Sequence, residues 1–399
     1  MKKRIITIII CVLSGITAMT AQKIATWPNG CKAVITFTFE DVTGMEGHQW
    51  AVEQLDQYGF KGTFFVVTNW NPNWDWCRTI AQNGHEIGSH SDSHPHNCDG
   101  EEASSKMHIE EKVGQPCLTM AYPNCNVPKN ESEVLNNYLG GRICNGSWMD
   151  LPDIMGKDGP SNWAKIPCNL CGNGGGYINT TNAFVSKCNE AIGKSGWVVF
   201  GLFGFSGLRN GNANYSPTNQ NAFMETLYWL DQNRSDYWVT TLRDAIMYIK
   251  ERNASNLYKK ASDNYSQTWK LIHNLDQTLC NWDYPLSIEI PLPASWTAVT
   301  VMQGDKKIDA EVKDGTVYFN AVPNGGDIVL QSGVKGDVNG DGGVDVADIA
   351  AVIDVMAGKG NSVTKAAADV NGDNGVDVAD IAAIIDIMAG NSRSVVLKN

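Results

Sequence analysis

The sequence predicts an α/β domain, then a small all-β domain, then a repeated acidic module. Three observations lead to this prediction. Strand-like and helix-like segments alternate over residues 23–253, short alternating strand patterns separated by glycine-containing turns fill residues 285–331, and residues 337–358 recur almost unchanged as residues 369–390. Alternating strands and helices are typical of parallel strands covered by helices. The length of the first region suits either a barrel or a doubly wound sheet.

The N-terminus has the pattern of a secretory signal peptide. Lys2, Lys3 and Arg4 precede an apolar run over residues 5–13, and small residues follow before Gln22. We expect cleavage after Ala21 and a secreted protein, located outside the cell, on its surface or in the periplasm. The apolar run is too short for a membrane span. The formal net charge of −12 argues against a nucleic-acid partner, because phosphates need cationic side chains.

Within the α/β region, apolar runs indicate buried strands and period-3.6 patterns indicate helices. The expected strands cover residues 33–39, 61–67 and 196–205, and the expected helices cover residues 50–59, 74–84 and 239–253. The first two helices end at Gly59 and Gly84, as helices often do. Strands this apolar on both faces are typical of parallel sheets.

The remaining chain divides by composition. We expect the signal peptide at residues 1–21, the α/β domain at residues 22–253, a linker and a small β-sandwich at residues 254–332, the repeated module at residues 333–390 and a tail at residues 391–399. The sandwich is predicted from hairpin signals at Gly304, residues 314–315 and residues 324–326.

The repeated module has the spacing of paired calcium loops. Oxygen-bearing side chains occupy loop positions 1, 3, 5, 9 and 12 in both copies: Asp337, Asn339, Asp341, Asp345 and Asp348, then Asp369, Asn371, Asp373, Asp377 and Asp380. Six to eight hard oxygen ligands suit Ca²⁺, so we expect two Ca²⁺ ions. A solvated acidic tail would not repeat the same spacing twice.

Each acidic loop leads into a predicted helix with an apolar stripe. The stripes are Ile349, Val352, Ile353 and Met356 in the first copy and Ile381, Ile384, Ile385 and Met388 in the second. We expect the two helices to bury these stripes against each other. The module resembles a type I dockerin, which implies docking to a cohesin-like protein or another surface protein. Residues 346–347 and 378–379 are apolar where dockerins often carry hydroxyl residues.

Histidines cluster after the predicted strand that follows residue 84. His90 and His94 are four residues apart, and Glu40 and Asp41 end the first predicted strand. Two imidazoles, a carboxylate and an open position form the ligand set of a catalytic divalent metal such as Zn²⁺. The second acid would then act as a general base. In the alternative interpretation, Glu40 caps the next helix and His90 is exposed.

These motifs resemble the NodB-homology polysaccharide deacetylases of carbohydrate esterase family 4. The resemblance rests on residues 38–42, 55–66 and 84–95 and extends to residues 237–253. It implies a distorted (β/α) barrel that removes N-acetyl or O-acetyl groups from an acetylated polysaccharide. It also implies that Asp41, His90 and His94 bind the metal and that Glu40 is the base.

The sequence departs from the family at four positions. Ala121 stands where an arginine would orient the base, Phe203 stands where a histidine would protonate the leaving group, Glu40 replaces aspartate, and Val42 replaces glycine. Loss of a general acid costs roughly 10²- to 10⁴-fold in rate. An O-acetyl group would suffer less than an N-acetyl group, because an alkoxide leaves more easily than an amide nitrogen. The candidate replacement acids are His48, His96 and His108.

Aromatic side chains near these motifs suit sugar stacking. Trp70, Trp74 and Trp76 follow the second predicted strand, and Tyr122 follows Ala121. We expect Trp74 and Tyr122 to contact the polysaccharide and at least one of the tryptophans to belong to the core. The cysteines after the signal peptide are expected in disulfides or as buried thiols, and this also holds for the closely spaced Cys168 and Cys171.

The leading hypothesis is a secreted, metal-dependent polysaccharide deacetylase or carbohydrate esterase with a calcium-binding docking module. An alternative is a catalytically impaired, carbohydrate-binding pseudoenzyme of the same fold, which the residues Ala121 and Phe203 favour. A third possibility is a scaffold component whose main function is docking.

Overall fold

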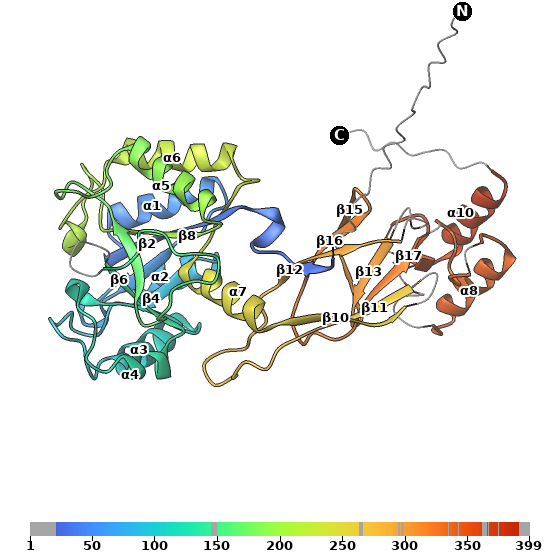
Figure 1. The fold of residues 1–399 in the computed structure, drawn as a ribbon, viewed down its shortest axis with the longest axis horizontal. Coiled ribbons are helices and arrows are strands. Elements are labelled where there is room, and N and C mark those ends of the chain that lie inside the picture. The colour runs from blue at the N-terminus through green and yellow to red at the C-terminus, as the bar shows by residue number, and fades with distance from the viewer. Residues whose placement is uncertain are drawn as a thin grey trace, which may run out of the picture.

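The computed structural model shows a barrel, a β-sandwich and a helical module in a row (Figure 1). It describes residues 21–144, 150–262, 266–293, 296, 299–333, 335–341, 343–360, 365, 367–373 and 375–390. The expected signal peptide, except for its last residue, and the expected tail lie outside these residues. Among the helices of the described residues, none is long and apolar enough to cross a membrane.

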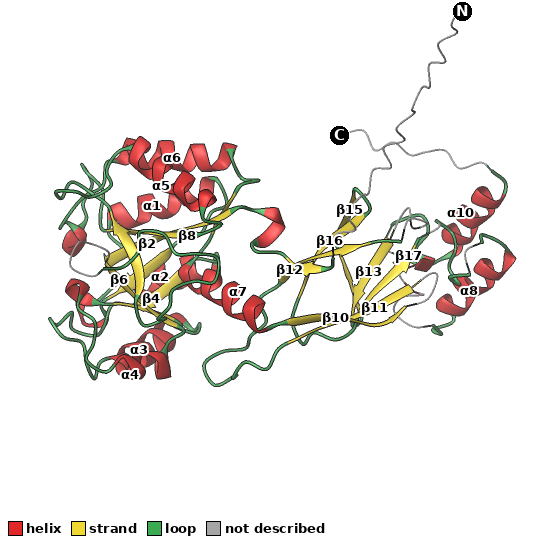
Figure 2. Ribbon diagram, in the orientation of Figure 1, coloured by secondary structure: helices red, strands yellow, loops and turns green. Residues whose placement is uncertain are grey.

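The barrel domain alternates strands and helices along the chain. Its strands are β2 Ala33–Val42, β3 Thr63–Val66, β4 Glu86–Ser89, β5 Thr119–Ala121, β6 Gly140–Cys144, β7 Ile166–Leu170, β8 Trp197–Leu202 and β9 Tyr237–Val239. Its helices are α1 Glu46–Gln57, α2 Trp74–Gln82, α3 Glu102–Val113, α4 Glu131–Asn137, α5 Thr181–Gly193, α6 Gln220–Gln232 and α7 Leu242–Ala254. The helices lie outside the strands (Figure 2).

In the described residues, seven parallel strands close into a ring. The order is β2-β3-β4-β5-β6-β7-β8, and β8 pairs with β2 again. Strand β2 is ten residues long and buried throughout. Two strands pair with the same edge of β2: β9 pairs with residues 33–35, and β3 pairs with residues 38–42. The predicted distorted barrel is therefore confirmed, and the carboxyl ends of its strands meet at one rim.

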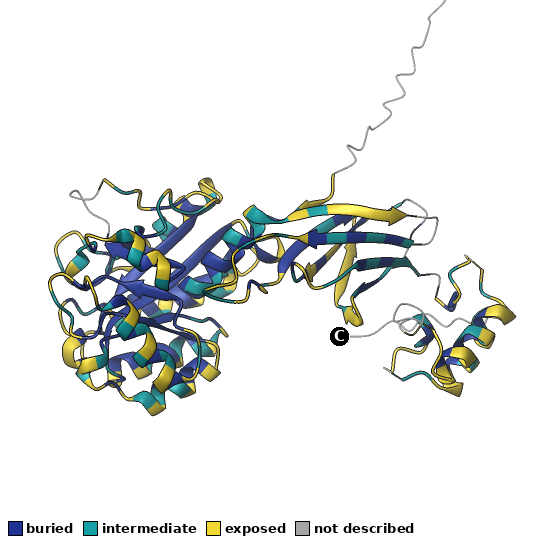
Figure 3. Cartoon of the chain, turned by 90° about the horizontal axis from the view of Figure 1, so that it is seen from below, coloured by how far each residue is buried: buried dark blue, intermediate teal, exposed yellow. Residues whose placement is uncertain are grey.

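The second domain is a sandwich of two antiparallel sheets. One sheet has the order β1-β12-β16-β15 and the other has the order β10-β11-β17-β13-β14. The strands are β1 Lys23–Ile24, β10 Asn256–Ser262, β11 Ser266–Ile272, β12 Leu286–Pro291, β13 Val299–Gln303, β14 Lys306–Ile308, β15 Ala310–Lys313, β16 Thr316–Ala321 and β17 Ile328–Ser332. Burial changes along these strands, whereas the barrel strands are buried along their length (Figure 3).

The barrel and the sandwich share one hydrophobic core. Tyr248 and Ile249 of α7 belong to the same buried cluster as Leu286 and Ile288 of β12. Strand β1, which sequence analysis assigned to the barrel region, pairs instead with β12 of the sandwich. The chain therefore crosses from the sandwich into the barrel before it returns.

A buried acid and a histidine face each other across this boundary. The side chains of Glu251 of α7 and His273 after β11 are fully buried, and Oε2 of Glu251 lies 3.7 Å from Nε2 of His273. The other oxygen of Glu251 accepts a hydrogen bond from the backbone N–H of Tyr284 at 3.0 Å. Burial raises the pKa of Glu251 to about 8 and lowers that of His273.

The cysteines follow the expectation of disulfides and buried thiols. Cys125 and Cys144 form a disulfide. Cys168 and Cys171 are free and fully buried. The disulfide joins the segment after β5 to the end of β6, at the rim of the barrel.

Candidate active site and calcium loops

The end of β2 delivers two consecutive acids to the barrel rim. Between Phe39 and Val42 the β2–β3 register contains one extra residue on β2, which is a β-bulge. Asp41 lies in this bulge with a φ of 57°. Adjacent residues of a regular strand point to opposite faces, but the bulge lets both Glu40 and Asp41 reach the same histidine.

His90 and His94 come from the loop that follows β4. The Nδ1 atom of His90 lies 2.8 Å from the carbonyl oxygen of Ala121. Because a carbonyl only accepts, Nδ1 carries the proton and Nε2 keeps its lone pair. The Nε2 atoms of His90 and His94 lie 3.6 and 3.4 Å from Oδ1 of Asp41.

Asp41, His90 and His94 form a group that fits a metal ion. Their potential ligand atoms lie within 4.8 Å of one another. Oδ1 of Asp41 is buried without a hydrogen-bond partner among the described residues. Burial, followed by the charge of Glu40, raises the pKa of Asp41 to about 7, and burial lowers the pKa of His90 well below its usual value. Lone pairs that converge in a buried site without protons between them are stabilised by a cation.

A buried arginine holds the second acid. Oε1 of Glu40 forms an ion pair with Nη2 of Arg142 at 2.7 Å, and both side chains are almost fully buried. Oε2 of Glu40 lies 3.8 Å from Nε2 of His90, so this oxygen faces the metal-ligand group. Burial raises the pKa of Glu40, and the charge of Arg142 opposes this shift.

Three strands provide the surroundings of this ion pair. Arg142 lies on β6, and its Nη1 is 3.4 Å from the sulfur of Cys168 on β7. On β8, a Cβ atom at Gly201 would lie 3.2 Å from Oε1 of Glu40, so a side chain there would crowd the carboxylate. Sequence reasoning missed Arg142; the signal that could have found it is a lone arginine inside the apolar run of residues 138–144.

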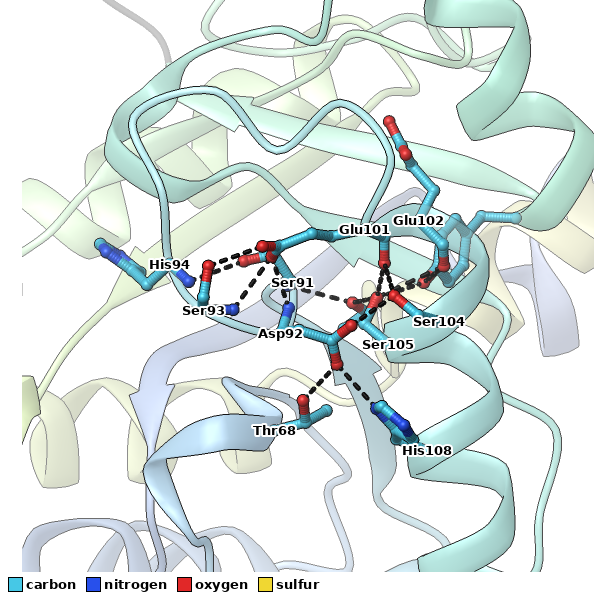
Figure 4. A network of polar contacts seen from close by, with 12 residues as sticks. Thr68, Ser91, Asp92, Ser93, His94, Glu101, Glu102, Ser104, Ser105 and His108 are labelled. Atoms are coloured by element: carbon cyan, nitrogen blue, oxygen red, sulfur yellow. Dashed lines mark hydrogen bonds and ion pairs between the residues drawn. The ribbon is translucent and has the colours of Figure 1, made fainter.

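A polar network fixes the loop between the two histidines (Figure 4). Glu101 accepts hydrogen bonds from the backbone N–H groups of Asp92 and Ser93, both at 2.9 Å, and from the hydroxyl of Ser93 at 2.6 Å. Asp92 accepts from Thr68, from Ser104 and, at 2.9 Å, from His108. These contacts hold the loop backbone that carries His90 and His94.

Of the expected sugar contacts, one does not fit the structure. Tyr122 is fully buried, and its hydroxyl donates to the carbonyl oxygen of Ala164 at 2.7 Å, so its side chain fills the core rather than facing a ligand. Trp74 is half-buried and packs against the barrel core. Trp70 lies beside the site, because its ring centroid is 5.0 Å from that of His94.

The candidate replacement acids are not members of the metal-ligand group. His48 is fully buried against the backbones of Glu40 and Phe203, and burial lowers its pKa to about 4. His108 pairs with Asp92, and the exposed His96 lies 3.3 Å from the amide nitrogen of Asn126. His85, another histidine near this loop, is fully buried and lies between the N–H of Gly62 and a carboxylate oxygen of Asp56.

The acidic loops adopt the same geometry in both copies. In the first, the side chain of Asp348 accepts from the backbone N–H groups of Val338 at 2.7 Å and Asp345 at 2.8 Å. In the second, Asp380 accepts from Asn371 at 3.0 Å and Asp377 at 2.9 Å. Helices α8 Val346–Met356 and α10 Val378–Met388 begin at these capping boxes. In both copies the last acid of the loop therefore ties the loop to its own backbone.

The helix stripes are buried only in part, which corrects the prediction that they bury each other. Val352 and Ile384 are fully buried between the helices. Ile353 and Ile385 are each 51% exposed because they lie on the outer side of the pair. Met356 and Met388 are exposed too, as are Val346 and Val378 at the helix starts.

Comparison with known proteins agrees with this architecture. Residues 28–138 match the family model for polysaccharide deacetylase, and residues 335–388 match that for the dockerin type I domain. One region of the chain therefore matches polysaccharide deacetylases, and another matches type I dockerin domains.

Individual relatives are distant. A gellan lyase from a Bacillus species is 24% identical over 337 residues, which cover 77% of this chain and 13% of that protein. A probable polysaccharide deacetylase from Pseudomonas aeruginosa has 14% identity and a TM-score of 0.40, with 55% of this chain and 91% of that chain covered. A family 4 acetyl xylan esterase from Clostridium thermocellum has 17% identity and a TM-score of 0.34, with 53% and 89% covered.

Proposed function

We propose that the barrel domain removes acetyl groups from a polysaccharide outside the cytoplasm, at a divalent-metal site. The observation that carries this proposal is the arrangement at the barrel rim: Asp41, His90 and His94 converge, and Glu40 points one oxygen at them. Two imidazoles and one carboxylate suit Zn²⁺. The signal-peptide pattern of residues 1–21 supports export.

Each residue of the site has a separate role in the proposed hydrolysis. Asp41, His90 and His94 would hold the cation, which when bound polarises an acetyl carbonyl and makes a water molecule more acidic. Glu40 takes the proton of the attacking water through Oε2. Arg142 keeps the carboxylate in place through Oε1. The Ala121 carbonyl fixes the tautomer of His90, so that Nε2 stays available.

The surroundings favour ester over amide hydrolysis. Phe203 follows β8 at the level of Glu40 and offers no proton. An alkoxide needs less assistance from an acid than an amide nitrogen does. We therefore propose O-acetyl groups as the preferred substrate, although N-acetyl groups belong to the same chemistry.

Acetate release tests the proposal. Acetylated xylan, chitin oligomers and peptidoglycan are incubated with the full chain and Zn²⁺, Co²⁺ or EDTA, beside His90→Ala. His96→Ala is the matched control, because His96 is an exposed histidine outside the ligand group. We expect metal-dependent release that His90→Ala abolishes and His96→Ala retains. Polysaccharide binding without release from any substrate would instead support the carbohydrate-binding pseudoenzyme, which the absence of a histidine at Phe203 favours.

We propose that the C-terminal module binds two Ca²⁺ ions and docks the enzyme to a cohesin-like or other surface protein. The support is the repeated loop geometry around Asp348 and Asp380 together with the exposed apolar residues that recur on α8 and α10. Calorimetry with Ca²⁺ is the test, and a stoichiometry of two ions per chain is expected.

A further inference from the structure

Two loops at the barrel rim hold a pair of tyrosines. The loop after β7 contains Tyr177, and the loop after β8 contains Tyr215. Ser216 joins the loops: its hydroxyl accepts from the N–H of Gly174 at 2.9 Å and lies 3.4 Å from Oδ1 of Asn173. Ser216 is fully buried, so the two loops are packed against each other at this residue.

The phenols lie on the same side of the rim as the proposed base. Leu202 pairs with Phe39, so Phe203 stands next to Glu40 on the neighbouring strand. The ring of Tyr215 packs edge-on against Phe203, with a centroid distance of 5.2 Å and an angle of 65°. The phenol of Tyr177 lies close enough to interact with that of Tyr215, and the charge of Glu40 also acts on it.

Tyr177 keeps its proton at neutral pH, because burial and the neighbouring phenol of Tyr215 raise its pKa to about 12. Tyr215 is 68% exposed, so its phenol can reach a ligand at the rim. His48, by contrast, is buried and neutral.

We propose that Tyr215 is a catalytic proton donor to the leaving group and that Tyr177 is a positioning residue for it. The inference rests on the proposed function. When the bond between the acetyl carbon and the sugar oxygen breaks, its electron pair goes to that oxygen, which takes the phenolic proton of Tyr215. The phenolate then regains a proton from water, and the proton that Glu40 received returns to solvent. A phenol is a stronger acid than a sugar hydroxyl, so this transfer is favourable.

Substrates that differ in leaving group test this role. Acetylated xylan releases an alkoxide that needs a proton, whereas 4-nitrophenyl acetate releases a phenolate that does not. Tyr215→Phe should lower kcat on acetylated xylan by on the order of 10²-fold and change the rate on 4-nitrophenyl acetate by less than about twofold. Tyr177→Phe should lower kcat on acetylated xylan by about tenfold with KM unchanged. Tyr228→Phe, at an exposed tyrosine of α6, is the control and should match the unmodified protein.

The outcomes separate this inference from the proposed function. Because both Phe variants keep their rings, the packing on Phe203 is retained, and thermal unfolding checks this. If the unmodified protein releases acetate from xylan and Tyr215→Phe is equally active, only the proton-donor role is overturned. The same holds if Tyr215→Phe loses activity equally on both substrates. If the unmodified protein releases no acetate from these two substrates, from chitin oligomers or from peptidoglycan, both proposals fail.

Discussion

Arg142 lies directly opposite Ala121 in the parallel register of β5 and β6. The guanidinium from position 142 forms the 2.7 Å ion pair with Glu40. An arginine that the family resemblance places on one strand is thus supplied by the next strand, at the same level of the barrel. The longer side chain of glutamate, compared with aspartate, is consistent with a partner in a different position.

Exchange of the arginine between these strands tests its role. Arg142→Met should lower kcat on acetylated xylan by on the order of 10²-fold, because Glu40 loses the contact that orients it. Loss of one partner of a buried ion pair also costs stability, about 3–5 kcal/mol, which thermal unfolding measures separately. Ala121→Arg in an Arg142→Ala background should recover part of kcat. A folded Arg142→Met variant with full activity would contradict the orienting role.

Metal removal should abolish hydrolysis reversibly. Dialysis against a strong chelator is expected to yield an inactive chain that regains activity with Zn²⁺ or Co²⁺, because Asp41, His90 and His94 supply the ligands. Elemental analysis after zinc loading should show metal in the unmodified protein and a large loss in Asp41→Ala. Replacement of a hydrogen-bond partner behind a ligand loop typically costs 10- to 100-fold in metal affinity, so Asp92→Ala should weaken binding without removing it. Equal zinc content in Asp41→Ala would refute the assignment.

Each calcium loop should lose its ion independently. Asp348→Ala removes the side chain that caps α8 and closes the first loop, and Asp380→Ala does the same for α10. Calorimetry should therefore give one Ca²⁺ ion for either single variant and no binding for the double variant. Asp354→Ala, on the exposed side of α8 outside the loop, is the control and should keep both ions. Two ions bound by Asp348→Ala would exclude this ligand set.

The buried pair between barrel and sandwich predicts a pH dependence of stability. Glu251 has a pKa of about 8 in the folded chain and about 4.3 when unfolded, so the folded state binds more protons between these values. Its contribution is fully present at low pH and is lost as the pH rises through 8. The pKa of His273 is shifted in the opposite direction, but His273 is present both in the unmodified protein and in the Glu251→Gln variant. As the pH rises, the free energy of unfolding of the unmodified protein should therefore fall relative to that of Glu251→Gln. Urea unfolding of both proteins at several pH values measures this difference.

A constant stability difference across that pH range would mean that Glu251 is not held protonated by the fold.

Local patterns predicted much of this fold and part of the site. The apolar runs around β2, β3 and β8 and the glycines after α1 and α2 place these elements close to where they lie. The separation between His90 and His94 predicted that both imidazoles would lie close together, as they do beside Asp41. The repeated acidic loops could be recognised because the spacing of their oxygen-bearing side chains is a property of one short segment.

Features that depend on packing between distant strands could not be predicted from the sequence. The pairing of Glu40 with Arg142 depends on the register of the closed ring, and no short segment of sequence specifies that register. Tyr122 was expected to face a sugar because it adjoins a motif, but the closing of β5 on β6 buries it. The bulge at Asp41 could be recognised only once β3 was aligned beside β2.

The pairing of β1 with β12 constrains the order in which the chain folds. Lys23 lies opposite Glu289, so β1 has no partner strand until β12, which lies far along the chain, is available. The apolar face of α7 is likewise covered only when Leu286 and Ile288 pack against it. Contacts between such distant parts of a chain slow folding. Barrel and sandwich therefore form one cooperative folding unit, and a chain cut after residue 253 would expose an apolar helix face and an unpaired strand.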